Sequence, residues 1–286
     1  MSDDNNLPLG GGSPFSRDAS QFLTPRPSPL NRLASFAAAA PIIPYAAPDY
    51  TPAFDISRWQ LDIDFKAAYA GGYRLVVIKA TDGMAIDPYY VRNWQMALDA
   101  GLRVMVYHFF RSNVDGIKQA DYHLEIIRPL MEATKTASWA DLETADGTTN
   151  AVRKPRLWAF LAQVKKAGIP TGVYSSNNYW QSLTDNATLT AEYWFWIAHW
   201  TTALNPTIPR GVTAAQTPLW QDAVYPTYSW GRPVPGVKTA VDNDRWRGSL
   251  QSLDQFLGLI QPEPTDAEKI KILWREAKSH GWNLNP

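Results

Sequence analysis

The chain has 286 residues, and its 27 Lys and Arg residues balance 27 Asp and Glu residues, so the formal net charge is zero. This length supports one large domain with a buried core, whereas a neutral chain lacks the basic excess typical of nucleic-acid binding. The sequence contains no cysteine, which excludes disulfides, thiolate zinc sites and a cysteine nucleophile. It contains 13 tryptophans, whose large rings either fill a core or line a sugar-binding cleft.

The first fifty residues are rich in proline, glycine and alanine and show no apolar periodicity. Such a segment cannot bury enough apolar surface to fold alone, which predicts an arm or linker over residues 1–51. The apolar stretch at 33–47 begins far from the start, contains two prolines and is too short to span a bilayer. We therefore expect neither a signal peptide nor a membrane span in this segment.

Short strand-like runs alternate with helical patterns through residues 52–260. The predicted strands are residues 53–56, 75–80, 103–109, 137–142, 171–174, 194–199, 218–221 and 239–242. The predicted helices are residues 63–70, 91–100, 117–130, 153–167 and 178–183, two of which are stopped by Gly101 and Gly168. Alternation of this kind predicts parallel strands joined by helices that cover the outside.

The pattern changes after the sixth predicted strand. Prolines crowd the last connections, at positions 206, 209, 226, 233 and 235, and no helical pattern separates the strands there. The count is therefore five β/α units followed by three strands, and eight strands are enough to close a barrel. The sequence predicts an α/β fold, a TIM-like (β/α)5(β)3 barrel, as the folded domain at 52–260.

Residues 261–286 predict a proline-containing spacer followed by a short amphipathic helix. Thr265 and Glu268 form a capping box at the start of this helix. Its apolar stripe consists of Ile270, Leu273, Trp274 and Ala277. Such a stripe either packs on the barrel or docks on a partner.

Four acidic residues lie where predicted strands end, at the edge of a β/α barrel that carries active sites. They are Asp55 on the first strand, Asp141 and Glu143 on the fourth, and Asp242 on the eighth. Alternation places Asp141 and Glu143 on one face of their strand, and barrel closure places Asp242 beside Asp55. Confined together, these carboxyl groups cannot all ionise, so the pKa of at least one should rise. A carboxyl group that stays protonated near neutral pH is the general acid that glycosidic bond cleavage needs.

The same region carries a series of longer motifs. In chain order they are FDISRWQ (54–60), VVIKATDG (76–83), DPYYVRNWQMALDAGLRVMVYHFFR (87–111), QADYHL (119–124), ADLET (140–144), WAFLAQVKKAGIPTGVYSSNNYW (158–180), WIAHW (196–200), PLWQ (218–221) and AVDND (240–244). Together they resemble glycoside hydrolase family 25, the lysozyme-like muramidases common among phage endolysins and bacterial autolysins. The resemblance covers residues 52–250 and implies a flattened barrel of five β/α units and three further strands.

The resemblance implies cleavage of the β-1,4 bond between N-acetylmuramic acid and N-acetylglucosamine in peptidoglycan, without a cofactor. Glu143 is similar to the family's general acid, and Asp141 resembles the partner acid of the D-x-E pair. Asp55 and Asp242 match the family's acids on the first and last strands. The resemblance also implies retention of configuration, with the N-acetyl group of the substrate as nucleophile and an Asp that orients it.

Two positions depart from the family's usual pattern. Asp82 stands where Glu is common, and this shorter side chain alters a loop or substrate contact without touching the four acids. Asp244 stands where an amide is more typical, so it adds a negative charge near the acids. This charge is expected to shift the pKa of Glu143 from the family's norm.

Further residues at or near strand ends are candidates for substrate binding. They are Lys79, Tyr107, His108, Tyr174, Trp196, Trp200 and Trp220. The aromatic rings either stack on sugar rings or fill the core, and His108 is either a partner of an acid or a wall residue. The four histidines are scattered through the chain, so we expect no metal site.

The sequence also fits two other hypotheses. A long arm without a signal peptide suits a structural or glycan-binding component of a phage tail or contractile injection particle, anchored through residues 1–51. A glycosidase of another N-acetylated polymer, such as chitin, is the second. For the preferred muramidase we expect peptidoglycan strands as partner and action at the bacterial cell wall, after release by a holin or delivery on a particle.

Overall fold

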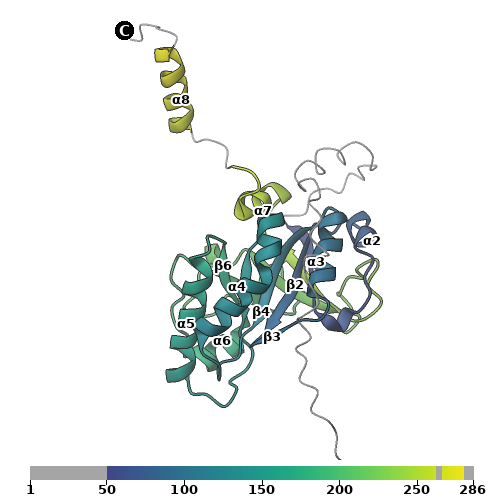
Figure 1. Ribbon diagram of the computed structural model, residues 1–286. Helices are drawn as coiled ribbons and strands as arrows, with labels where there is room; N and C mark the ends of the chain where they lie inside the picture. Colours follow the sequence, from purple (N-terminus) through teal and green to yellow (C-terminus); the bar gives the residue numbers. More distant parts are fainter. Residues whose placement is uncertain (1–49, 262–265, 280–286) are drawn as a thin grey trace, which may run out of the picture. The chain divides into compact units, whose positions relative to one another are not determined.

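A closed barrel of eight strands forms the centre of the computed structural model, which describes residues 50–261 and 266–279 (Figure 1). The strands are β1 (Thr51–Ile56), β2 (Leu75–Asp82), β4 (Arg103–Phe109), β5 (Ser138–Asp141), β6 (Thr171–Ser176), β7 (Trp194–Ala198), β8 (Leu219–Tyr225) and β9 (Val241–Trp246). Their order around the barrel is β1-β9-β8-β7-β6-β5-β4-β2, and a direct pairing of β1 with β2 closes it. The predicted (β/α)5(β)3 barrel is confirmed. The predicted arm up to residue 49 and the Thr265 cap lie outside the described residues.

The last strand runs against the others. Seven strands pair in parallel from β1 to β8, whereas β9 is antiparallel to both of its neighbours, β1 and β8. The predicted bounds of this strand, 239–242, were wrong, because pairing with β1 and β8 extends through the polar residues that follow Asp242. A short strand that the sequence did not predict, β3 (Ala85–Ile86), pairs with the end of β2.

Five helices follow the first five parallel strands of the barrel, as the sequence predicts. They are α2 (Phe65–Ala70), α3 (Tyr90–Asp99), α4 (Gly116–Ala133), α5 (Asn150–Lys165) and α6 (Asn177–Thr184). The side chains of Asp64, Asp115 and Ser176 cap three of them by accepting hydrogen bonds from backbone N–H groups of the first turn. Gly101 and Gly168 follow the ends of α3 and α5 with φ of 92° and 79°, a left-handed conformation that favours glycine. The sequence did not predict α7 (Leu250–Leu257), which is capped by Ser249.

Two apolar layers hold the barrel together. On its outside, residues such as Val76, Val104 and Val173 pack beneath the helices, with α3 lying on β2 and β4 and α5 on β5 and β6 (Figure 1). Inside, large side chains fill the end at which the parallel strands begin. This apolar floor consists of Leu75, Val77, Met105, Trp139, Leu219 and Trp246. Phe256 of α7 stacks against Trp139 and makes a tilted ring contact with Trp246, so α7 covers this end.

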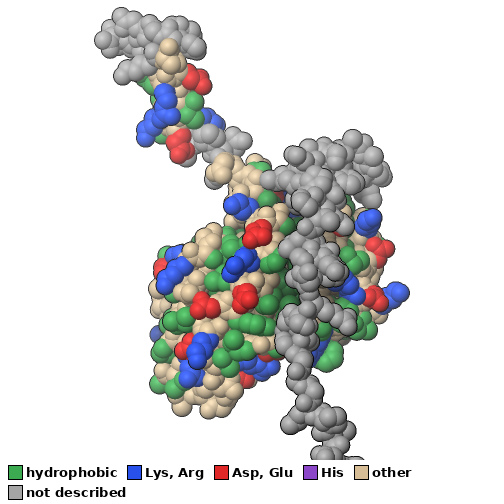
Figure 2. Space-filling model, in the orientation of Figure 1, with side chains coloured by type: hydrophobic (Ala, Val, Ile, Leu, Met, Phe, Trp, Pro, Cys, Tyr) green, Lys and Arg blue, Asp and Glu red, His purple; other side chains and the backbone are tan. Residues whose placement is uncertain are grey.

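Charged side chains of both signs lie on the outer surface of the helices (Figure 2). Figure 2 shows Lys and Arg side chains interspersed with Asp and Glu side chains over the helices on this face. The predicted C-terminal helix forms as α8 (Asp266–Ser279), on which Ile270, Leu273 and Trp274 are exposed. Within the described ranges, no helix is both long and apolar enough to cross a membrane.

Candidate active site

A cleft of about 340 Å³ opens at the end of the barrel where the parallel strands finish. Nine of the eleven residues that the sequence singles out line it: Asp55, Lys79, Tyr107, Asp141, Glu143, Tyr174, Trp196, Trp200 and Asp242. These residues come from β1, β2, β4, β5, β6, β7 and β9 and the segments that follow β5 and β7. Barrel closure therefore gathers side chains that are widely separated in the sequence.

Asp55 and Asp242 are neighbours because β9 is antiparallel to β1. Their backbones form a register pair, although 187 positions (242 − 55) separate them in the sequence. The sequence predicts this adjacency but places Asp242 at the end of its strand. In the structure it is the second residue of β9, and the start of an antiparallel strand lies at the same edge as the ends of its parallel neighbours.

Asp141 and Glu143 face the same cleft, as strand alternation predicts. Asp141 is the last residue of β5, and Glu143 lies two residues further along. Burial raises the pKa of Asp141 well above its usual value, and the charge of Glu143 adds to this effect. Burial also raises the pKa of Glu143, against the opposing effects of a hydrogen bond from Tyr174 and the charge of Lys79. Protonated carboxyl groups are therefore favoured in a cleft that is open to substrate.

The acids of β1 and β9 show the same effect. Burial and the charges of Asp55 and Glu143 raise the pKa of Asp242 to about 8. Burial, followed by the charge of Asp244, raises the pKa of Asp55 well above its usual value, while a hydrogen bond from Gln221 opposes the shift. We call the five residues Asp55, Asp141, Glu143, Asp242 and Asp244 the acidic layer, because they lie directly above the apolar floor inside the barrel.

Aromatic rings form the wall of the cleft. The ring centroids of Tyr174 and Trp196 lie 4.4 Å apart, and that of Tyr107 lies 6.1 Å from Trp196 in an edge-to-face arrangement. Trp200 is 46% exposed, which leaves much of its ring available to a ligand. Tyr107, Tyr174 and Trp196 are buried behind it, so Trp200 offers the open ring face of this wall beside the acids.

Sequence reasoning missed five lining residues, which are Ser57, Trp59, Gln60, Phe109 and Gln221. Trp59, which is 67% exposed, lies in the turn after β1 and was noted only as part of a motif. Gln221 accepts hydrogen bonds from the Tyr174 hydroxyl (2.8 Å) and the Trp200 indole (2.9 Å) and donates one to Asp55 (2.8 Å). The sequence could have revealed Gln221 through its place in the PLWQ motif. It lies two residues after the inward Leu219, and strand alternation therefore predicts an inward side chain.

His108 and Trp220 do not line the cleft. Each follows an inward position on its strand, so alternation turns both toward the helices, where they are buried. The indole N–H of Trp220 donates to the backbone oxygen of His199 (2.8 Å). Neither side chain faces the acidic layer, and their assignment to substrate binding loses its support.

The environment of His108 fixes its hydrogen-bonding role. Its Nε2 lies 3.0 Å from the side-chain oxygen of Gln119, an acceptor, so Nε2 carries the proton and Nδ1 accepts from Thr81. His123 Nδ1 then donates to the Thr81 oxygen, and Ser138 donates to His123 Nε2. Burial lowers the pKa of His108 to about 4, in agreement with a neutral ring in this chain of hydrogen bonds.

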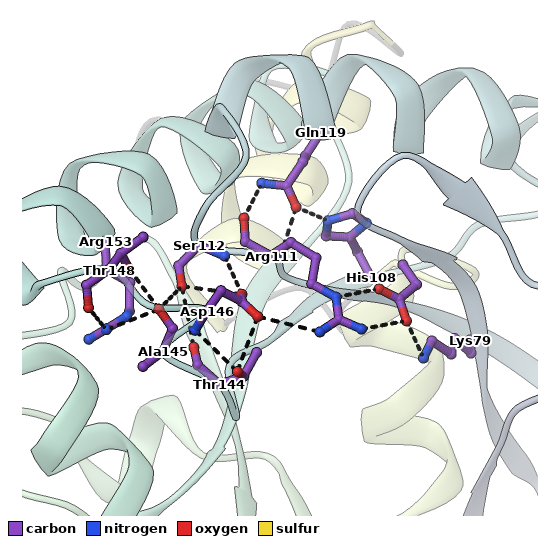
Figure 3. Close-up of polar contacts among 11 residues, drawn as sticks. Lys79, His108, Arg111, Ser112, Gln119, Thr144, Ala145, Asp146, Thr148 and Arg153 are labelled. Carbon is purple, nitrogen blue, oxygen red and sulfur yellow. Dashed lines mark hydrogen bonds and ion pairs between the residues drawn. The ribbon is translucent and has the colours of Figure 1, made fainter.

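A polar network anchors the segment after β5, which carries Glu143 (Figure 3). The guanidinium group of Arg111 binds both carboxylate oxygens of Asp82, and Lys79 binds the same carboxylate at 3.2 Å. Arg111 also reaches Asp146, whose other oxygen accepts from the backbone N–H of Ser112 (2.7 Å). Burial opposes the effect, yet the hydrogen bond from Arg111 and the charge of Lys79 lower the pKa of Asp82. Asp82 is therefore connected through Arg111 and Asp146 to the segment that carries Glu143.

A closed β/α barrel with buried, protonatable acids and aromatic walls at the carboxyl ends of its strands is a glycosidase-type architecture. The sequence profile of glycosyl hydrolases family 25 matches residues 54–225, which is more than half of the 286 residues. The chain belongs to glycoside hydrolase family 25.

Relatives with known names agree with this assignment. Lysozyme M1 of Streptomyces globisporus is 28% identical over 219 residues, which cover 70% of this chain and 68% of that protein. An N,O-diacetylmuramidase of Arthroderma benhamiae is 28% identical over 228 residues, covering 71% of this chain and 85% of its own length. The crystal structure of the bacterial lysozyme from Streptomyces coelicolor superposes with a TM-score of 0.62 at 24% identity, covering 72% of this chain and 96% of the other. This last likeness supports the fold.

Proposed function

We propose that this chain is a muramidase that cleaves the β-1,4 bond between N-acetylmuramic acid and N-acetylglucosamine in peptidoglycan. One observation carries the proposal: Asp141 and Glu143 share an open cleft in which burial raises the pKa of both. Family membership and relatives named lysozyme and N,O-diacetylmuramidase support the choice of substrate.

Glu143 is proposed to act first as the acid and then as the base. Its proton passes to the glycosidic oxygen as the bond between that oxygen and the anomeric carbon breaks. Asp141 or Asp242 stabilises the positive charge that develops on the sugar or orients the N-acetyl group of the substrate. A water molecule then adds to the anomeric carbon and returns a proton to Glu143. The side chains of the cleft supply every proton transfer, so the reaction needs no cofactor.

The remaining cleft residues are proposed to hold the glycan strand. Asp55 is proposed to position the neighbouring acids. Lys79 of β2 lines the cleft and is proposed to contact the glycan strand. The rings of Tyr107, Tyr174, Trp196 and Trp200 are proposed to bind sugars, and Trp59 is added to this set. His108 and Trp220 are left out, because both are buried on the helix side of the barrel.

The enzyme is proposed to act at the bacterial cell wall, reached through holin release or on a phage or injection particle. The alternative of a structural or glycan-binding part of such a particle depends on residues 1–51, of which 1–49 lie outside the described part of the chain. No described residue favours that alternative over the muramidase.

Digestion of purified peptidoglycan tests the proposal. Wild type should release fragments with muramic acid at the reducing end, detected by borohydride reduction and mass analysis. Glu143→Gln should lower the rate by a factor of about 100 to 10,000, the usual contribution of general acid–base catalysis. Glu132→Gln, which alters an exposed side chain of α4, is the matched control and should digest like wild type.

Two results would contradict the proposal. Equal rates for wild type and Glu143→Gln would remove the general acid. Fragments that end in reducing N-acetylglucosamine, or faster digestion of chitin than of peptidoglycan, would assign the cleft to another bond or polymer.

A further inference from the structure

Asp244 is the most deeply buried member of the acidic layer. It lies on β9 two residues after Asp242, opposite Ala53 of β1, and has no exposed surface. Its side chain points into the barrel on the face that carries Asp55, and the register makes the two residues diagonal neighbours across β1 and β9, with interacting carboxyl groups. Two buried carboxyl groups therefore lie side by side, below the part of the cleft that faces substrate.

Each of these two carboxyl groups receives one hydrogen bond from a neighbouring donor. The indole N–H of Trp196 donates to Oδ1 of Asp244 at 2.8 Å, and the amide of Gln221 donates to Oδ2 of Asp55 at 2.8 Å. The orientation of the Gln221 amide is fixed, because its oxygen accepts from the indole N–H of Trp200, a group that can only donate. No N–H or O–H donor of the described residues reaches Oδ2 of Asp244.

The contact between the two carboxyl groups thus lacks a donor. A hydrogen bond between them requires a proton on one oxygen, since two ionised carboxylates only repel each other. We propose that Asp55 and Asp244 hold one proton between them at neutral pH, and that Asp244 is thereby a positioning residue for Asp55. The pair then carries one negative charge, and Asp244 serves in place of an amide that would donate to Asp55.

The surrounding charges agree with this arrangement. Burial is the largest cause of the raised pKa of both Asp55 and Asp244. The charged and titratable groups that face the pair are Lys79 from β2, Tyr107 from β4, Asp141 and Glu143 from β5 and its continuation, Tyr174 from β6, Asp222 from β8 and Asp242 from β9. Lys79 is the only cation among them, and Asp222 is already paired with Arg232 and Arg245. The excess of acids favours the retained proton.

The consequence for catalysis rests on the proposed function. A pair with one charge leaves Asp242 and Glu143 beside a single negative charge rather than two, which limits the increase in their pKa values. The hydrogen bonds of Gln221 also connect the pair to Tyr174 and Trp200, so the position of Asp55 is tied to the aromatic wall.

The number of protons released on unfolding at pH 6 tests the shared proton without any measurement of activity. At this pH an unfolded Asp is ionised, so a proton held by the folded pair is released when the chain unfolds. Asp244→Asn and Asp55→Asn should each release one proton fewer than wild type. The double variant should release the same number as either single variant, because one shared proton can be lost only once. Asp121→Asn, at an exposed position of α4, is the control and should match wild type.

Three outcomes would overturn the proposal. Unchanged release in Asp244→Asn would mean that the pair holds no proton, and a loss of two protons in the double variant would mean two independent protonated acids. If a variant fails to fold, carboxyl ¹³C NMR titration of the wild type replaces it. The Asp55 and Asp244 signals should then both respond in each of two separate steps, one below and one above neutral pH, and independent titration of each signal in its own single step would contradict sharing. A failure of either measurement leaves the muramidase proposal standing, since that proposal is tested by digestion products.

Discussion

The two halves of the barrel interior are built by the same strands and have opposite character. β5 contributes Trp139 to the apolar floor and Asp141 to the acidic layer, and β9 contributes Trp246 and Asp244 in the same way. A separate hollow of about 750 Å³ near the floor is lined by apolar and polar side chains, among them Trp194, Trp246 and Phe256, and by none of the five residues of the acidic layer. Two positions along a strand therefore separate a structural core from a reactive site.

The apolar floor buries the acids that lie above it. Trp139 and Trp246 fill the barrel beneath the acids and keep water out from below. Burial is accordingly the first cause of every raised pKa in the acidic layer. The floor adds stability by burying apolar surface, whereas the layer above it reduces stability by burying groups that would ionise in the unfolded chain.

Truncation of the floor should give the largest effect. Trp139 is fully buried and contacts Trp196 and Phe256, so Trp139→Ala leaves a cavity. We expect the free energy of unfolding to fall by about 3–5 kcal/mol, measured by urea denaturation. Trp158→Ala, which changes a partly buried tryptophan outside the barrel, should cost less. An equal loss of unfolding free energy in both variants would show that the apolar floor contributes no more to stability than the packing of Trp158.

Neutralising an acid of the acidic layer should raise the free energy of unfolding instead of lowering it. The pKa of Asp242 is about 8 in the folded state, whereas an unfolded Asp ionises near pH 4. Wild type therefore loses stability as pH rises from about 4 to 8, and Asp242→Asn removes this loss. We expect the variant to be more stable by about 1–2 kcal/mol at pH 7, with no difference below pH 4, in denaturation measured across pH. A variant less stable than wild type at pH 7 would contradict the assignment.

Two tryptophan variants should distinguish substrate binding in the cleft from packing on the helix side of the barrel. Trp200→Ala removes an exposed wall ring and should raise KM for peptidoglycan about fivefold, equivalent to roughly 1 kcal/mol of binding. Trp220→Phe should leave KM unchanged but lower the free energy of unfolding by about 1 kcal/mol, because the hydrogen bond to His199 is lost. A larger increase in KM for Trp220→Phe than for Trp200→Ala would indicate that Trp220 contacts the substrate.

The smallest expected effect is a displacement of the pH profile. Lys79 and Tyr174 both lower the pKa of Glu143, so Lys79→Met and Tyr174→Phe should each raise it. A general acid works only while protonated, and the alkaline limb of kcat/KM should therefore move to higher pH in both variants. Movement to lower pH, measured on soluble peptidoglycan fragments, would rule out Glu143 as the group that sets this limb.

Much of this molecule was predictable from local pattern. Strand and helix alternation gave the barrel, and alternation within β5 placed Asp141 and Glu143 together. The direction of β9 was not predictable, because its strand begins at Val241 and continues through polar residues whose partners are supplied by other strands. His108 was misplaced for a similar reason, since a polar residue at a strand end resembles a site residue until its hydrogen bonds to Thr81 and Gln119 are known.

The sequence by itself determined the fold, the family and the acids of the D-x-E pair, because periodicity and motifs are local properties of the chain. Only the tertiary structure decided which acids meet and in which protonation state. Asp55 and Asp244 lie 189 positions apart (244 − 55), and their contact depends on the antiparallel register of β9 with β1. Their pKa values depend on burial by the apolar floor, which exists only once the barrel has closed.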